Sequence, residues 1–286
     1  MTYKREDVAC MMRIRNEARW IREVISKAFQ VVGTVVVLDD GSDDQTVAEC
    51  VAAWSGHVDV VPNHDTFVLR SDEATLHVIR SPFRPATRTS QAVSEIRDKN
   101  FLWEYCKSKV LFRHMLCLDG DEVPSQVFIR DFHQIIIWLE KQVDVVNIPF
   151  IYLWDGNNQR RVDGIYGNLP DGQPRLRFPR LFTIDRITPD QLHIMRFAWE
   201  GSKGGFHCGS IPQENFRPNG GEKVIATFGR ALIHYGYRDD ADRRRKYVFY
   251  NQIDPGNKFE GEYKHIIGEP NVHAPGAVEL ISWDDK

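Results

Sequence analysis

Two short acidic clusters in this chain each follow an apolar segment of strand length. The acids at 39–40 come directly after Thr34–Leu38, and the sequence Asp-Gly-Asp at 119–121 closes Val110–Leu118. Two carboxylates separated by one glycine can converge on a hard cation, Mg²⁺ or Mn²⁺, whose other ligands are phosphate oxygens and water. One Asp-x-Asp alone is more often a solvated turn, but two clusters at strand ends indicate a cation-assisted site for a phosphorylated ligand.

The segments around these acids alternate between strand-like and helix-like patterns. Val8–Ile14 is a short apolar run, a segment with apolar residues at helical spacing follows it, and Thr34–Leu38 is apolar at every position, as in a strand buried on both faces. Further strands are expected at Leu76–Ile79, Val110–Leu118 and Val143–Leu153, and helices at about Ser90–Lys107 and Phe132–Leu139. This alternation predicts an α/β fold with a mostly parallel sheet, in which ligands bind at the carboxyl ends of the strands.

The chain changes character after residue 153. From Trp154 to Gly221, glycine, proline and arginine are frequent and the apolar periodicity is poor. We expect loops and short strands in this region, which is typical of a substrate-facing segment on a rigid base. The run Arg243–Lys246 follows several aspartates in a predicted helix, so we expect a solvated face, with a contact for an anionic acceptor as the alternative.

Composition argues against several classes of function. The 286 residues carry 37 Lys and Arg against 40 Asp and Glu, and this net charge of −3 gives no general attraction to nucleic acid or anionic membranes. The apolar runs are shorter than the roughly 20 residues of a membrane-spanning helix, and no secretion signal is visible. The five cysteines are an odd number in mostly apolar segments, so we expect reduced thiols and a soluble, cytoplasmic protein.

Several common motifs are missing from the sequence. It contains no CxxC, HExxH or GxxxxGK[ST], so structural zinc sites, zinc proteases and P-loop NTPases have no support. The first predicted strand is followed by Arg15-Asn16-Glu17, where a nicotinamide dehydrogenase would carry G-x-G-x-x-G. The sequence therefore argues against that class as well.

Four motifs in order resemble the bacterial family 2 glycosyltransferases, which are nucleotide-diphospho-sugar transferases of the GT-A fold. The motifs are Met12–Glu17, Val37–Asp44, Arg97–Asn100 and Leu118–Glu122. Two later stretches, Gly205–Gly209 and Leu232–Tyr237 with Lys246 and Tyr247, are similar to one bacterial branch, so the likeness covers about residues 7 to 268. The resemblance implies one domain, with a nucleotide-sugar-binding half at residues 1–142 and an acceptor-binding half at residues 143–286.

The resemblance also implies a role for each matching position. The nucleotide-sugar-binding residues would be Arg13, Arg15, Glu17, Asp39, Asp40, Arg97, Asp119 and Gly120, with a UDP-sugar as the favoured donor. A Mn²⁺ or Mg²⁺ ion would bind to Asp119, Asp121 and His234. Such an ion stabilises the charge that develops on the departing diphosphate.

An inverting transferase of this kind needs a general base for the acceptor hydroxyl. Relatives commonly carry a carboxylate where this chain has His207 and Cys208, and a thiol cannot act as that carboxylate. We therefore expect His207 or Glu200 as the catalytic base, ranked equally, with Glu214 third. Sugar rings could stack on aromatic residues of the second half, namely Tyr152, Trp154, Tyr166 and Trp199, although packing is the more common role of such residues.

The leading hypothesis is a metal-dependent inverting glycosyltransferase that acts on a hydroxyl acceptor such as a glycan or a lipid-linked saccharide. One alternative is a glycosyltransferase that acts on modified nucleic-acid bases, which the net charge disfavours. Another is a non-catalytic sugar-nucleotide-binding module on the same fold. The sequence leaves the transferred sugar and the acceptor open.

Overall fold

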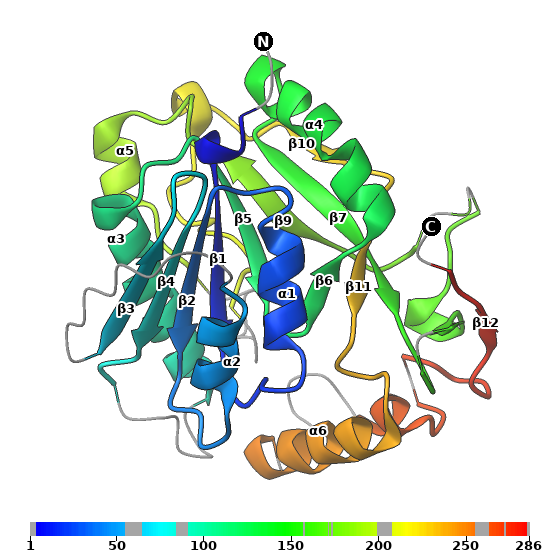
Figure 1. Ribbon diagram of the computed structural model, residues 1–286. Coiled ribbons are helices and arrows are strands. Elements are labelled where there is room, and N and C mark those ends of the chain that lie inside the picture. Colours follow the sequence, from blue (N-terminus) through cyan, green and yellow to red (C-terminus); the bar gives the residue numbers. More distant parts are fainter. Residues whose placement is uncertain are drawn as a thin grey trace.

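The computed structural model describes residues 4–54, 65–83, 91–156, 158–170, 172, 174–198, 208–254, 263–271 and 273–284. Its centre is a ten-stranded sheet with the order β3-β4-β2-β1-β5-β9-β7-β11-β6, in which β10 also pairs with β7 (Figure 1). The strands are β1 (Val8–Ile14), β2 (Thr34–Asp39), β3 (Thr66–Arg70), β4 (Thr75–Arg80), β5 (His114–Asp119), β6 (Glu122–Pro124), β7 (Val145–Tyr152), β8 (Gln159–Arg161), β9 (Arg177–Thr183), β10 (Ile225–Thr227), β11 (Leu232–His234) and β12 (Leu280–Ser282). Strands β4, β2, β1 and β5 are parallel neighbours, as the sequence predicted.

Helices cover both faces of this sheet (Figure 1). The α-helices are α1 (Ile21–Ala28), α2 (Thr46–Ala52), α3 (Gln91–Lys109), α4 (Gln126–Lys141), α5 (Pro189–Ile194) and α6 (Asp240–Ile253). Short 3₁₀ helices lie at Arg5–Asp7, Gly164–Tyr166, Pro218–Gly220 and Tyr263–Ile267. The predicted mixed α/β architecture with helices flanking a central sheet is therefore confirmed.

The central strand β1 divides the core into two layers. Cys10 and Met12 point to the layer that contains the buried residues of α1 and α4, whereas Ala9 and Met11 point to the layer that contains Trp103 of α3. This division follows from the alternation of side chains along a strand. Because both faces are covered, β1 is apolar at almost every position, which is why the sequence pattern identified it.

Two predicted elements differ from the structure. The strand expected from Val110 begins only at His114, since Leu111 is 92% exposed and Arg113 pairs at the surface with Asp185. The region 154–221, expected to hold only loops and short strands, contributes the seven-residue strand β9 to the middle of the sheet. Strand β9 is antiparallel to both neighbours and carries arginines among its apolar residues, so its pattern was not recognisable as that of a central strand.

Within the described ranges, no helix combines the length and the apolar character needed to cross a membrane. All five cysteines are buried and free. Burial raises the pKa of Cys208 to about 12, with Glu95 adding to this effect and Lys99 opposing it, so this thiol is not a nucleophile at neutral pH.

Candidate functional site

The carboxyl ends of β1, β2 and β5 bring three of the predicted site segments to one edge of the sheet. In the parallel register, Ile14 lies opposite Asp39 and Arg13 lies opposite Asp119. The backbone N–H of Asp40 donates to the carbonyl of Ile14 at 2.9 Å, which continues the strand pairing into the loop. The two acidic clusters, separated by about eighty residues in the sequence, therefore lie next to the same strand.

Arg13 joins two buried carboxylates at this edge. Its guanidinium donates to Oδ2 of Asp40, and its Nε donates to Oδ2 of Asp98 at 3.1 Å. The side chains of both acids are 0% exposed. Burial raises the pKa of Asp40 to about 6, an effect that Arg13 opposes and Asp98 increases. Removing Arg13 would therefore leave two carboxylates buried without their shared counter-ion.

Asp98, the second residue of the motif at residues 97–100, connects this motif to Arg13 and Asp40, which form one network of ion pairs. Arg97 donates to Oδ1 of Asp98 at 2.8 Å, and its guanidinium lies 4.2 Å above the ring of Phe83. Arg97 therefore borders the network, while Asp98 is the residue that bonds to Arg13. Arg15 is half-buried, and its charge contributes to lowering the pKa of the Asp40 carboxyl against the larger effect of burial.

The loop after β1 is held in place by the loop after β2 and by the first residue of α2. The backbone N–H of Asn16 donates to Oγ of Ser42 at 2.9 Å, and that of Glu17 donates to Oγ1 of Thr46 at 2.8 Å. Asn16 has a φ of 55°, a left-handed conformation that asparagine adopts more readily than most residues. These contacts fix Glu17 beside the strand ends.

Asp39 and Asp40 differ in what their carboxylates contact. Asp39 accepts a hydrogen bond of 2.5 Å from the hydroxyl of Ser42, so it closes the turn after β2. Oδ1 of Asp40 is buried and has no hydrogen-bond partner among the residues that the structure describes. A buried acceptor without a partner is costly, so this oxygen of Asp40 needs a hydrogen bond from a water molecule or from a ligand that reaches it.

Asp119 bonds to an arginine that the sequence patterns did not identify. Nη2 of Arg180 in β9 lies 3.0 Å from Oδ2 of Asp119 and also donates to Glu122. Glu122 in turn accepts from the backbone N–H of Asp119 at 3.0 Å. The partial burial of Asp119 would raise its pKa, but the charges of Arg180 and Lys99 bring the pKa below its ordinary value. The carboxylate of Asp119 is therefore ionised, and its side chain is 43% exposed.

Asp121 bonds to a different cation. Nζ of Lys246 in α6 donates to Oδ2 of Asp121 at 2.5 Å, and Nε2 of His234 lies 3.6 Å from the same oxygen. Burial would raise the pKa of Asp121, but the charge and hydrogen bond of Lys246 hold it well below its ordinary value. Burial lowers the pKa of His234 to about 4, an effect that Asp121 opposes. The two aspartates of the Asp-Gly-Asp motif thus bond to two separate cations.

Gly120 makes room for the loop after β1. A Cβ on Gly120 would approach Cγ of Glu17 to 2.8 Å and Cγ2 of Ile14 to 3.0 Å. Burial raises the pKa of Glu17 to about 8, with Asp121 adding to this effect and Lys246 opposing it. The glycine therefore allows Glu17 to pack against the Asp-Gly-Asp turn.

In the described arrangement, the Asp121 oxygen that lies nearest His234 is not free to bind a divalent cation. Mg²⁺ and Mn²⁺ need a carboxylate oxygen that is free to ligate. The oxygen of Asp121 that faces His234 already accepts from the ammonium of Lys246, and Asp119 bonds to Arg180 instead of turning to the same place. No group of three His, Cys, Asp or Glu side chains in the described ranges could hold a metal ion.

The predicted catalytic bases cannot be compared with this geometry. His207 and Glu200 lie outside the described residues, as does Trp199. Glu214, the third candidate, is exposed, and its backbone pairs with that of Arg196. The choice between His207 and Glu200 stays a prediction.

The described aromatic residues considered for stacking on sugar rings pack against other side chains, which is the role that the sequence favoured. The ring of Tyr152 stacks on His234 with centroids 4.6 Å apart and contacts Tyr166 at 5.0 Å. Trp154 is 3% exposed and lies between the guanidinium groups of Arg161 and Arg243, at 4.5 Å and 4.2 Å. Packing thus accounts for the described members of this set.

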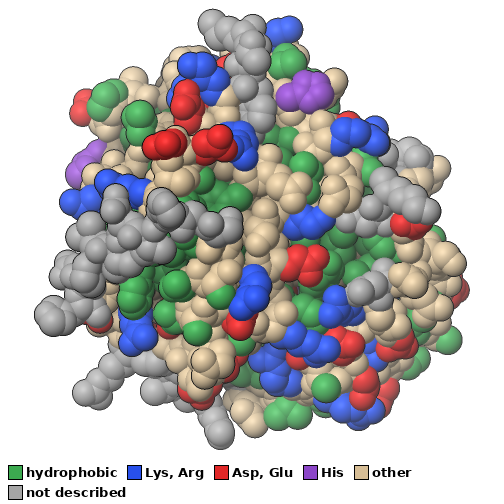
Figure 2. All heavy atoms as spheres, viewed as in Figure 1, with side chains coloured by type: hydrophobic (Ala, Val, Ile, Leu, Met, Phe, Trp, Pro, Cys, Tyr) green, Lys and Arg blue, Asp and Glu red, His purple; other side chains and the backbone are tan. Residues whose placement is uncertain are grey.

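The basic run 243–246 is not uniformly solvated, contrary to expectation. Arg244 is 70% exposed and Arg245 is 50% exposed, whereas the side chains of Arg243 and Lys246 are 5% and 19% exposed. In Figure 2, basic and acidic side chains gather at the lower part of the molecule, where α6 lies in Figure 1. The spacing of three residues turns Arg243 and Lys246 to the inner side of α6.

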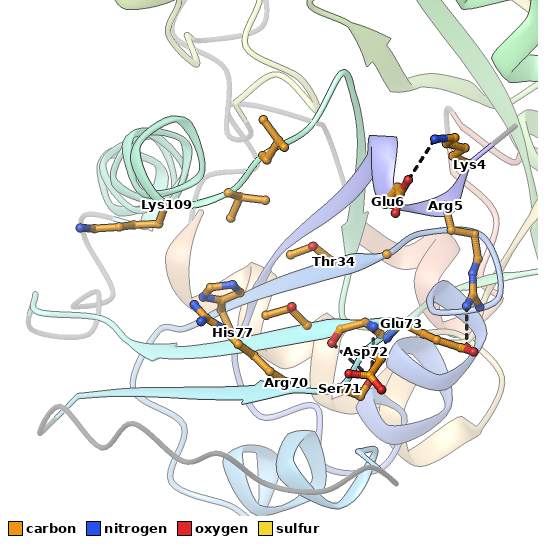
Figure 3. A pocket seen from close by; sticks show the side chains of 15 residues that line it. Lys4, Arg5, Glu6, Thr34, Arg70, Ser71, Asp72, Glu73, His77 and Lys109 are labelled. Atoms are coloured by element: carbon orange, nitrogen blue, oxygen red, sulfur yellow. Dashed lines mark hydrogen bonds and ion pairs between the residues drawn. The ribbon is translucent and has the colours of Figure 1, made fainter.

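Two cavities lie at opposite edges of the sheet. A small one beside the candidate site is lined by side chains that include Arg13, Lys99, Asp119 and Arg180. Another, of about 620 Å³, lies at the amino ends of β2 and β4 and is lined by residues such as Arg70 and His77 (Figure 3). The second cavity contains none of the predicted site residues.

No protein-family model and no curated protein sequence matches the chain. Among solved structures, the chain is similar to S. aureus TarS 1-349, with 11% identity, coverage of 92% of this chain and 69% of that one, and a TM-score of 0.47. It is also similar to glucosyl-3-phosphoglycerate synthase from Mycobacterium tuberculosis in complex with phosphoglyceric acid, with 13% identity, coverage of 86% and 79%, and a TM-score of 0.43. The same synthase in complex with Mn²⁺ and UDP-glucose has 17% identity, coverage of 51% and 43%, and a TM-score of 0.30. At TM-scores below 0.5, these likenesses assign no activity to the chain.

Proposed function

We propose that this chain is a glycosyltransferase of the GT-A type that transfers a sugar from a nucleoside diphosphate sugar, preferably a UDP-sugar, to a hydroxyl acceptor. The observation that carries the proposal is the position of Arg13, which bonds to Asp40 and Asp98 and lies in register with Asp119 at the carboxyl ends of the strands. In open α/β sheets this edge is where nucleotides bind. Oδ1 of Asp40 would accept from the nucleoside, because it has no partner among the described side chains.

The proposed reaction inverts the configuration at the anomeric carbon. The acceptor hydroxyl attacks this carbon from the face opposite the diphosphate, the bond from the carbon to the phosphate oxygen breaks, and a base takes the hydroxyl proton. We propose His207 or Glu200 as that base. Negative charge then develops on the leaving diphosphate, and fixed cations beside it stabilise the transition state. The cations that border the small cavity, namely Arg13, Lys99 and Arg180, support this part of the proposal.

The two halves would divide the substrates between them. Residues 1–142 would bind the donor, because they contain the strand-end acids and the Arg97–Asn100 motif. Residues 143–286 would bind the acceptor and supply the base. The five free cysteines support a reducing compartment such as the cytoplasm as the place of action.

The test is a panel of UDP-, GDP- and dTDP-sugars, with binding measured by calorimetry and release of nucleoside diphosphate measured with and without candidate hydroxyl acceptors. We expect binding of at least one donor, and slow hydrolysis or transfer that is lost in His207→Ala or Glu200→Gln while binding is kept. Binding with no turnover under any condition would favour a non-catalytic module. No binding of any donor would overturn the proposal, and salt-sensitive binding to duplex DNA would redirect it to nucleic-acid acceptors.

A further inference from the structure

Lys246 contacts the second acid of the Asp-Gly-Asp motif, one of the predicted ligands of the divalent ion. Its Nζ is 2.5 Å from Oδ2 of Asp121, and the two side chains are only 19% and 7% exposed. Arg244, in the same helix, is in contrast 70% exposed. Among the described acids, its Nε pairs only with Asp240, one turn earlier in α6. Lys246 is therefore part of the candidate site and not of the solvated face of α6.

The packing around the ammonium group holds it in this position. A Cβ built on Gly236 would overlap Nζ of Lys246 and Oδ2 of Asp121, so only glycine leaves room for this ion pair. The ring of Tyr237 lies 5.5 Å from the ammonium, and the imidazole of His234 borders the same carboxylate oxygen. The backbone N–H of Tyr235 donates to the carbonyl of Asp121 at 2.8 Å, which fixes this turn against the segment after β11.

An ammonium group in this environment has the chemistry that a diphosphate requires. Lysine carries three N–H donors and binds phosphate oxygens as a point charge. Among the described residues, the hydrogen bond of Lys246 goes to Asp121, so its further donors can serve a ligand. A cation fixed before the reaction stabilises the developing charge of a leaving group without reorganisation.

We infer that Lys246, held by Asp121, binds the diphosphate of the donor in place of a divalent ion, so that the donor binds without metal. This inference rests on the proposed function, because it names the group that binds the diphosphate in the proposed donor site. Asp121 then positions Lys246 and is not a metal ligand. The expectation of a Mn²⁺ or Mg²⁺ ion at Asp119, Asp121 and His234 is replaced by a cation of the chain itself.

The experiment measures the binding of UDP, GDP and dTDP by calorimetry, once in EDTA and once in Mn²⁺. The proteins compared are the wild type, Lys246→Met and, as the matched control from the exposed side of the same helix, Arg244→Met. We expect the wild type to bind one nucleotide in EDTA with an affinity within about threefold of that in Mn²⁺. Lys246→Met should weaken this binding at least about tenfold, and Arg244→Met should leave it within about twofold.

A second variant keeps the lysine and tests whether Asp121 positions Lys246 or binds a metal ion. Asp121→Asn can still accept a hydrogen bond from Lys246, so binding in EDTA should stay within about fivefold of the wild type. If Asp121 were a metal ligand, this variant would lose Mn²⁺-dependent binding, and the electron paramagnetic resonance signal of Mn²⁺ would show a site in the wild type that the variant lacks. Thermal unfolding of each variant shows whether it is folded before binding is compared.

The possible failures are distinguishable. Nucleotide binding that requires Mn²⁺ and is unchanged in Lys246→Met would overturn the inference and leave the proposed transferase standing. The absence of any nucleotide binding, with or without Mn²⁺, would overturn the proposed function together with the inference. Metal-free binding that is equally strong in the wild type and in Lys246→Met would overturn the role of the lysine alone.

Discussion

The ammonium of Lys246 lies 2.5 Å from Oδ2 of Asp121, although 125 residues separate them in the sequence. The contact pairs the acid of a strand-end turn with the inner side of α6. Arg13 forms an ion pair with Asp40, and Arg180 forms one with Asp119. Each of these three acids therefore has a cation from another segment as its partner. The candidate site is therefore a set of ion pairs at one sheet edge.

Replacing Arg13 with methionine should destabilise the fold strongly. Its guanidinium lies between the carboxylates of Asp40 and Asp98, whose side chains are 0% exposed. Its loss leaves Asp40 without its ion-pair partner and Asp98 with Arg97 alone, which costs about 3 kcal/mol of unfolding free energy. Urea unfolding measures this loss. Arg22→Met is the control, because Arg22 is 56% exposed where it pairs with Glu49, and a surface pair contributes about 1 kcal/mol at most. Equal losses in the two variants would contradict the assigned geometry.

Replacing Asp40 with asparagine should weaken the binding of nucleosides but not of pyrophosphate. The unpartnered Oδ1 of Asp40 is expected to accept from the base or ribose, and losing a charge-assisted hydrogen bond lowers the affinity for UDP about tenfold. The affinity for inorganic pyrophosphate should change less than about threefold. Calorimetry with both ligands provides the comparison. An equal loss of affinity for UDP and for pyrophosphate would mean that the substitution disturbs the whole site and does not act through a contact with the nucleoside.

Replacing Gly236 with alanine should displace the ammonium of Lys246. The new methyl group would overlap both Nζ of Lys246 and Oδ2 of Asp121. We expect at least about tenfold weaker nucleotide binding and a lower melting temperature, because the buried pair loses its geometry. Gly276→Ala is the matched control, since a Cβ there meets no atom within 4 Å. A Gly236→Ala protein with unchanged binding would show that the position of the ammonium does not matter.

Stability should depend on pH through His77, which lines the cavity in Figure 3. Burial and the charge of Arg70 lower its pKa from 6.5 to about 4, and its Nδ1 lies 2.9 Å from the hydroxyl of Tyr105. Between these pH values the unfolded chain binds a proton that the folded chain does not bind. The free energy of unfolding therefore falls as the pH decreases from 6.5 to 4, by about 3 kcal/mol from this residue.

The difference between the wild type and His77→Gln isolates this effect, because the other titrating groups are common to both proteins. Urea unfolding at several pH values should give a difference in unfolding free energy that is constant above pH 6.5 and changes between pH 6.5 and 4. The variant should become relatively more stable as the pH falls. A difference independent of pH would show that His77 titrates normally in the folded protein.

The sequence alone determined the α/β alternation and the edge of the sheet at which the acids lie. Buried parallel strands need uninterrupted apolar runs, so β1 and β2 were visible locally, and the acids that end β2 and β5 marked the edge. Strand β9 was not predicted, because Arg180 interrupts its apolar pattern.

Only the tertiary structure decided what each acid contacts. Asp119 meets Arg180 across 61 residues, and Asp121 meets Lys246 across 125. Such partners depend on which strands become neighbours and on how α6 packs against them. Contacts between residues so far apart in the sequence produce no periodic pattern from which they could be predicted. The motif with two aspartates therefore predicted a metal ion, while the folded molecule brings an ammonium group of its own to the same carboxylate.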